Sequence, residues 1–231
     1  MKKVLQTGVL MSMILLSAAT FAQTQSTELK KSGKDKKTPK TYLDLMINVV
    51  STNINYGGAN SSLSDYKKSN NGIQAGASFQ AGITPGFSMV TELYFMRKGG
   101  RLKSNNPLTT SESILRLNTI ELPVLARFHF GKFYLNAGPS IAYNLSGTRK
   151  IDDVSNKLSF SNSTAGFKRF DAGVQMGGGV EFPFKKRRIA LDIKYNYGLT
   201  NIAYNKETYN RALMISVHFS KAWKTNPLGR K

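Results

Sequence analysis

The stretch Arg188-Ile-Ala-Leu-Asp-Ile-Lys-Tyr-Asn-Tyr-Gly-Leu199 alternates between two kinds of side chain. Large apolar or aromatic residues occupy every second position from Ile189 to Leu199, and Ala, Asp, Lys, Asn and Gly fill the positions between them. Successive side chains of a β-strand point to opposite faces of its sheet. The period of two therefore predicts a strand with one apolar face and one polar or small-residue face.

The same alternation recurs through most of the chain after residue 40. In one segment the phase changes, because Leu115 and Leu117 lie in one register whereas Ile120 and Leu122 lie in the other. A β-bulge near Thr119 would bring both halves into one strand. The pattern predicts eight strands, at residues 42–50, 72–84, 87–98, 113–130, 133–145, 170–184, 188–199 and 212–219.

The connections between these strands alternate strictly in length. Tight turns fall at 84–86, 131–132 and 185–187, and the long connections are 51–71, 99–112, 146–168 and 200–211. Outer-membrane barrels sort their connections in this way, with long loops outside and short turns in the periplasm, whereas a soluble barrel has no reason to do so. We therefore expect an all-β fold, an eight-stranded antiparallel up-and-down transmembrane β-barrel with long extracellular loops and short periplasmic turns.

Aromatic residues form two bands under this topology. Two aromatic belts, one at each interface, are typical of a barrel that spans a membrane. One band falls beside the periplasmic turns and comprises Phe87, Phe128, Phe130, Phe133, Phe182, Phe184 and Phe219. The other lies toward the outer strand ends and comprises Phe95, Tyr143, Phe170, Tyr195 and Tyr197.

The two ends of the chain differ from the part between them. Lys2 and Lys3 precede an apolar run and the small residues before Ala22, which predicts a signal peptide at 1–22; the run is short for a transmembrane helix. Residues 23–40 are polar and Lys-rich and predict a flexible periplasmic tether. The barrel is expected at 41–219 and a periplasmic C-terminal tail at 220–231, which places both termini in the periplasm of an outer-membrane protein.

Charge and cysteine content narrow the possible functions. The chain has 33 basic and 13 acidic residues, a formal net charge of +20, and no cysteine, so disulfides, thiolate catalysis and cysteine-ligated metal sites are excluded. An anionic partner is expected. Nucleic acid fits poorly because the basic residues lie mostly in loops and tails of an exported chain, whereas lipid phosphates or a surface polyanion fit better.

Four motifs carry a resemblance to a known family. They are Glu92-Leu-Tyr-Phe95 with Lys98-Gly99, Ile120-Glu-Leu-Pro-Val-Leu125, Gly177-Gly-Gly-Val-Glu-Phe182 and Tyr195-Asn-Tyr-Gly-Leu-Thr-Asn-Ile202. Over 41–219 their order and spacing resemble the PorT-like outer-membrane β-barrel family of Bacteroidota, although Thr119 stands where that family often has an aromatic residue. The resemblance implies an eight-stranded barrel in the outer membrane. Some members are linked to protein secretion and gliding motility, and most have no assigned role.

The polar face of the strands is expected to line the lumen. An eight-stranded barrel is just wide enough for side chains to fill it, so these residues are expected to form a polar plug of ion pairs and hydrogen bonds. A proton or ion path through the plug is the alternative. The predicted plug consists of Asp44, Glu92, Glu121, Arg127, Asp171, Glu181, Asp192 and Lys194, with Lys98, His129 and Gln175 as further candidates.

Basic residues gather in the long connections. They are expected either to bind lipopolysaccharide phosphates or to be ordinary solvated loop charges. The candidate anionic-lipid contacts are Lys67, Lys68, Arg101, Lys103, Arg149, Lys150, Lys168 and Arg169, with Lys157, Lys206 and Arg211 also in or beside the loops. At the other end, the basic run 185–188 is expected to face the periplasm.

The sequence shows little sign of catalysis. His218 and Ser220 share one strand face, a spacing that resembles lipid-A-deacylating barrels, but spacing identifies no acid for them and they fall at the periplasmic end. We expect no catalytic, cofactor or metal site. The expected function is a non-enzymatic envelope scaffold or an accessory component of an assembly such as a secretion system. The expected partners are outer-membrane lipid, lipopolysaccharide and other envelope or secretion proteins. A narrow channel and a lipid-modifying enzyme are the alternatives.

Overall fold

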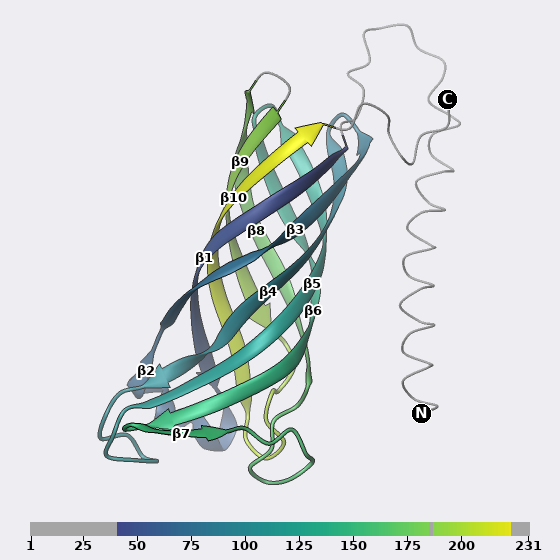
Figure 1. Ribbon diagram of the computed structural model, residues 1–231. Helices are drawn as coiled ribbons and strands as arrows, with labels where there is room; N and C mark the ends of the chain where they lie inside the picture. Colours follow the sequence, from purple (N-terminus) through teal and green to yellow (C-terminus); the bar gives the residue numbers. More distant parts are fainter. Residues whose placement is uncertain (1–40, 185–186, 223–231) are drawn as a thin grey trace, which may run out of the picture.

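The computed structural model describes residues 41–184 and 187–222, which form a closed antiparallel β-barrel (Figure 1). Neighbouring strands pair in chain order, and the last pairs with the first, from Tyr42 opposite Ala222 to Tyr56 opposite Thr208. The wall strands are β1 (Tyr42–Tyr56), β3 (Asn70–Thr84), β4 (Phe87–Leu102), β5 (Ser113–Phe130), β6 (Phe133–Ile151), β8 (Phe170–Phe184), β9 (Arg187–Gly198) and β10 (Thr208–Ala222). The predicted eight-stranded barrel is confirmed.

Short turns and long connections lie at opposite ends of the barrel. The short turns, at the top of Figure 1, share their end with residues 41 and 222. We call this the turn end and the opposite one the loop end. The long connections contain a 3₁₀-helix, η2 (Gly58–Tyr66), and two short strands, β2 (Lys67–Lys68) and β7 (Val154–Lys157).

Several strands run further than the alternation predicts. β1 continues to Tyr56, and β6 continues to Ile151, where it pairs with Val154 of β7. The backbone ladder persists there although polar side chains on both faces have ended the two-residue pattern. Likewise, Ser220 lies within β10 and not in a tail.

The predicted signal peptide, the tether, residues 185–186 and residues 223–231 lie outside the described residues.

The irregularity expected near Thr119 is present, but in a different strand. In the ladder between β5 and β6, Asn118 pairs with Ser146 and Thr119 with Asn144, so the extra residue is Leu145 of β6. β5 itself keeps one phase throughout, with its odd-numbered residues from 113 to 127 buried. Leu115 and Leu117 point inward because the loop end of the lumen is apolar, as described below.

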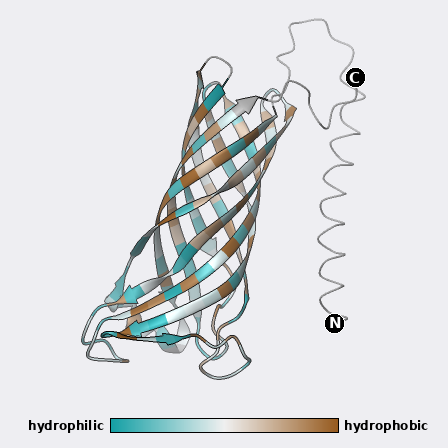
Figure 2. Cartoon of the chain, viewed as in Figure 1, coloured by the Kyte–Doolittle hydropathy of each residue, from teal (hydrophilic) through white to brown (hydrophobic). Residues whose placement is uncertain are grey.

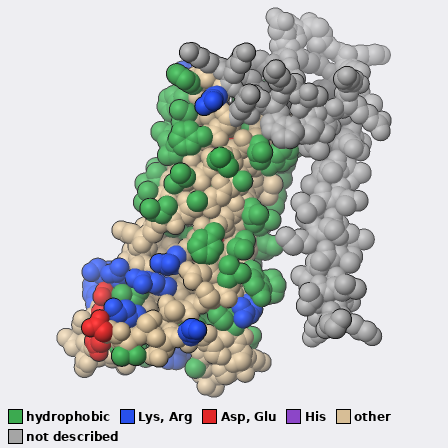
Figure 3. Space-filling model, in the orientation of Figure 1, with side chains coloured by type: hydrophobic (Ala, Val, Ile, Leu, Met, Phe, Trp, Pro, Cys, Tyr) green, Lys and Arg blue, Asp and Glu red, His purple; other side chains and the backbone are tan. Residues whose placement is uncertain are grey.

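The barrel wall is mostly apolar on its outer face and mostly polar on its inner face. Figure 2 shows the alternation of hydropathy along the strands, and Figure 3 shows the apolar side chains on one side of the outer wall. Leu45 and Ile73 on the outer wall are 71% and 75% exposed, whereas Asn48 and Glu121 inside are fully buried. Aromatic residues of both predicted bands also lie outside, and Phe133 and Phe170, one from each band, are about two-thirds exposed. An apolar exterior around a polar interior is the arrangement of a barrel surrounded by lipid. Among the described residues, no helix has the length and apolar character needed to cross a bilayer.

Candidate functional site

Charged side chains occupy much of the interior of the barrel. The structure places all eight predicted plug residues on the inner face of the wall. Seven of them are at most 3% exposed, and only the Glu181 side chain, near the turn end, reaches 20%. Lys98, which the sequence offered as a further candidate, is also inside and 3% exposed.

The middle of the lumen holds one isolated ion pair. Lys194 Nζ donates to both carboxylate oxygens of Glu92, each 2.6 Å away, and neither side chain is exposed to solvent. Lys194 stands on β9 and Glu92 on β4, so the pair crosses the barrel between strands that do not pair with each other.

Toward the loop end, Lys98 joins two carboxylates. Its Nζ lies 2.7 Å from Glu121 Oε2 and 3.4 Å from Asp171 Oδ2. Amide groups complete the cluster: Asn196 donates to Glu121, and Asn210 donates to Asp171. The opposite charges and the amide donors together offset the cost of removing three charges from water.

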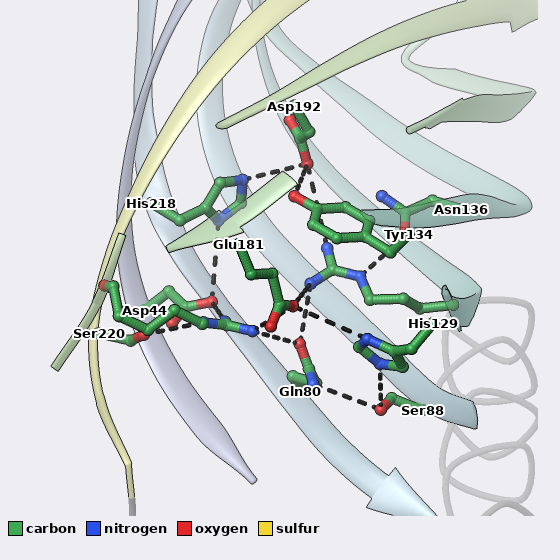
Figure 4. Close-up of polar contacts among 12 residues, drawn as sticks. Asp44, Gln80, Ser88, His129, Tyr134, Asn136, Glu181, Asp192, His218 and Ser220 are labelled. Carbon is green, nitrogen blue, oxygen red and sulfur yellow. Dashed lines mark hydrogen bonds and ion pairs between the residues drawn. The ribbon is translucent and has the colours of Figure 1, made fainter. Parts of the chain in front are cut away.

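At the turn end, two arginines share one glutamine (Figure 4). Arg127 and Arg188 each donate from Nη1 to Gln80 Oε1, over 2.8 and 2.9 Å. Arg188 also forms ion pairs with Asp44 at 2.6 Å and with Glu181 at 2.8 Å.

Arg188 corrects one expectation of the sequence. The basic run 185–188 was expected to face the periplasm, but Arg188 is only 2% exposed and lies inside the barrel, whereas its neighbour Arg187 is exposed. The strand period explains the difference: β9 begins at Arg187, and the next residue must point to the opposite face. The sequence signal was available, since Arg188 is in phase with Asp192 and Lys194.

The two histidines lie inside the barrel near its turn end. His218 Nε2 is 3.3 Å from Asp192 Oδ2, and its Nδ1 is 3.8 Å from Asp44 Oδ2, so two acids accompany it that sequence spacing could not identify. Ser220 Oγ accepts a hydrogen bond from Arg188, and no hydrogen bond joins it to His218 within the described residues.

The other histidine has a serine partner. Ser88 Oγ is 2.9 Å from His129 Nε2, and Glu181 Oε1 is 3.9 Å from the other ring nitrogen (Figure 4). A nucleophile needs an aligned base and access to substrate. Ser88 is 2% exposed, so substrate has little access to it, and the Glu181 oxygen that lies near His129 also accepts a hydrogen bond from Arg188.

In the described part of the chain, no three His, Asp or Glu residues are grouped so as to hold a metal ion.

An apolar cap closes the loop end. Residues of two long connections fold over the lumen, with Phe167 bridged to Ala203 and the backbone N–H of Lys168 donating to Ile202 O over 2.7 Å. Beneath them lie inward-facing side chains of β1 and β5. The cap cluster comprises Ile54, Leu115, Leu117, Phe167, Ile202 and Ala203.

Residues of the motif Tyr195–Ile202 form hydrogen bonds in the Lys98 cluster and in the loop that carries part of the apolar cap. Asn196 donates to Glu121 and Thr200 Oγ1 donates to Asp171, which connects the motif to the Lys98 cluster. Asn201 Oδ1 accepts the backbone N–H groups of Ala203 and Thr208, which shapes the loop that presents Ile202 to the cap.

The predicted lipid-contact residues lie toward the loop end, where Figure 3 shows basic side chains gathered beyond the apolar wall. Several already have partners in the chain. Lys150 lies 3.2 Å from Asp153, Arg101 lies 3.9 Å from Glu112, and the Arg169 guanidinium is 4.6 Å from the Phe160 ring centre. Lys67, Lys68 and Lys103 have no ion-pair partner among the described residues.

Several solved structures resemble this chain. The chain is similar to OprG of Pseudomonas aeruginosa (12% identity, TM-score 0.47, covering 82% of this chain and 98% of OprG). It is also similar to Neisserial surface protein A (11%, 0.45, 79% and 97%) and to the outer membrane protease OmpT of Escherichia coli (9%, 0.42, 83% and 99%). Such distant likenesses carry no statement about activity. A search of curated proteins finds no match. The family model of the outer membrane protein beta-barrel domain matches residues 21–204, which is most of the chain. The chain therefore belongs to this family of outer-membrane β-barrels.

Proposed function

We propose that this barrel is a non-enzymatic scaffold and an accessory part of a larger envelope assembly, such as a secretion system. The observation that carries the proposal is the filled lumen. An apolar cap, the Lys98 and Lys194 ion pairs and the two arginines near Gln80 block successive levels of it. Breaking a buried ion pair costs about 3–5 kcal/mol, so a filled interior favours a function performed by the outer surfaces.

The orientation and the narrower family belong to the same proposal. Short turns in the periplasm and long loops outside are the rule for outer-membrane barrels. Because residues 41 and 222 share the turn end, this rule supports the proposal that both termini lie in the periplasm. The roles of Asn196, Thr200 and Asn201 in the plug and cap support closer membership of the PorT-like barrels, since the resembling motif contains these residues. In this orientation the basic side chains of the loop end meet lipopolysaccharide and other outer-leaflet phosphates.

Conductance separates the scaffold from a channel. The purified full chain in a planar bilayer is expected to give no unitary currents, with a known porin as the positive control. Steady currents that Lys194→Met alters would replace the scaffold with a narrow channel.

Partner capture tests the assembly itself. Crosslinking before detergent extraction, followed by pull-down, is expected to recover the same envelope proteins in replicate preparations. Deletion of the gene is expected to reduce the secreted protein fraction. Absence of a reproducible partner together with unchanged secretion would overturn the scaffold.

A further inference from the structure

A pocket of about 310 Å³ opens near the loop end, where β1 and β3 separate. β1 pairs with β3 only as far as Thr52 opposite Asn70, and beyond that point only with β10. Outward-facing residues of β1, β9 and β10 line most of the pocket, together with the segment that follows η2, and the inward-facing Ile54 and Ala212 complete its lining. Its polar lining consists of Ser51, Asn53, Asn55, Lys67, Ser69 and Arg211.

On the side of the pocket that faces the turn end, the outer wall becomes strongly apolar. Val49 of β1 pairs with Ile215 of β10 and with Ile73 of β3, and Ile215 pairs with Ile193 of β9. These four side chains are 52–75% exposed and form one continuous row on the lipid side. Arg211 lies four residues from Ile215 along β10, so its backbone stands on the order of 13 Å of strand from the row, toward the loop end.

The pocket contains two cations, Arg211 and Lys67, that have nitrogen atoms free to bind a ligand. The Arg211 guanidinium lies 3.5 Å from the Tyr197 ring centre, and its Nη1 donates to the carbonyl oxygens of Gly198 and Asn210. Its other two nitrogens have no hydrogen-bond partner among the described residues, and neither does Lys67 Nζ. The described residues that line the pocket include no carboxylate.

We propose that this pocket binds the phosphorylated headgroup of an outer-leaflet lipid. The apolar row accommodates acyl chains, Arg211 and Lys67 neutralise the phosphate, and the Asn and Ser side chains offer hydrogen bonds to the sugar or glycerol part. A soluble phosphate would not need the apolar row beneath the cations, which favours a lipid. The inference rests on the proposed orientation of the barrel. It assigns lipid binding to one pocket, whereas the proposed function assigns it to the basic side chains of the loop end in general.

The test measures lipid binding to the purified full chain in detergent by native mass spectrometry. The probes are bis-phosphorylated lipid A, the same lipid without phosphates, and inorganic phosphate. Lys67→Gln removes a cation that makes no ion pair in the described structure, and Arg211→Gln removes the positioned one. Arg97→Gln is the matched control, because Arg97 is another exposed outer-wall cation, hydrogen-bonded to Asn118 and outside the pocket. Heat-modifiable gel migration verifies that each variant is folded.

Each pocket variant is expected to bind phosphorylated lipid A about tenfold more weakly, the usual size of one lost charge-assisted hydrogen bond, while the control matches the wild type. The wild type is expected to bind the dephosphorylated lipid at least as weakly as each variant binds the phosphorylated one, because loss of the phosphates removes both cation contacts. Equal binding by wild type and both pocket variants would overturn the site. Inorganic phosphate that binds in a variant-sensitive way without competition from lipid A would also overturn it, in favour of a soluble ligand. A conducting barrel with intact lipid binding would contradict only the scaffold.

Discussion

Lys194 Nζ lies 2.6 Å from both carboxylate oxygens of Glu92, and neither side chain reaches solvent. Removal of one partner leaves an uncompensated charge in the barrel interior. Lys194→Met is therefore expected to lower the free energy of unfolding by about 3–5 kcal/mol. Urea titration in lipid vesicles, followed by heat-modifiable gel migration, measures the change.

A double variant provides the stricter comparison. Glu92→Leu with Lys194→Met removes both charges, so it is expected to be closer in stability to the wild type than Lys194→Met alone. Lys150→Met is the surface control, because Lys150 pairs with the exposed Asp153 and such pairs contribute about 0–1 kcal/mol. A double variant that is less stable than either single variant would contradict the unpaired-charge explanation.

Gly179 makes room for the Tyr134 ring inside the barrel. A Cβ atom added there would lie 2.5 Å from Tyr134 Oη and 2.4 Å from the backbone oxygen of Leu191, which cannot move freely. Gly179→Ala is expected to cost about 1–3 kcal/mol of unfolding free energy, as overpacking usually does. Gly72→Ala is the control, since a Cβ atom at that position meets nothing within 4 Å. Equal stability of the two variants in urea would show that the wall adapts to the extra atom.

The fold was predictable because the two-residue period is a local property of the chain. A strand between lipid and a polar interior needs that period, so the strands, their inner faces and the alternation of turns and loops follow from the sequence. Ion-pair partners do not follow in this way. Lys98 meets Asp171 across the barrel from a strand that does not pair with its own, and only the closed barrel brings them together.

The same local rule misassigned Leu115 and Leu117. Apolar side chains in this barrel belong outside unless another apolar group covers them inside, and here Phe167 and Ile202 provide that cover from connections distant in the chain. An alternation pattern contains no information about which loop folds over which strand. The apparent change of phase in β5 therefore arises because Leu115 and Leu117 pack inward against the cap. The bulge itself lies in β6.

Arg187 and Arg188 are adjacent in sequence but face opposite sides of the wall. Arg188→Gln leaves Asp44 without its ion-pair arginine in a buried site, and a loss of about 3–5 kcal/mol in unfolding free energy is expected. Arg187→Gln is expected to change stability by no more than about 0.5 kcal/mol, as for most surface substitutions. Parallel urea titrations of the two variants decide the matter. Equal losses would contradict the inward placement of Arg188.

His218 provides the sharpest test of the proposal that the barrel is not an enzyme. Its ring is 1% exposed and lies 3.3 Å from Asp192 inside the wall, whereas a lipid-modifying residue must reach lipid on the outside. Mass spectra of lipid A from a deletion strain complemented with wild type, His218→Ala or Ser88→Ala are therefore expected to be identical. Ser88→Ala covers the other serine–histidine pair, Ser88 and His129. An acyl chain that is lost from lipid A with the wild type but retained with either His218→Ala or Ser88→Ala would place catalysis in the lumen and end the scaffold proposal.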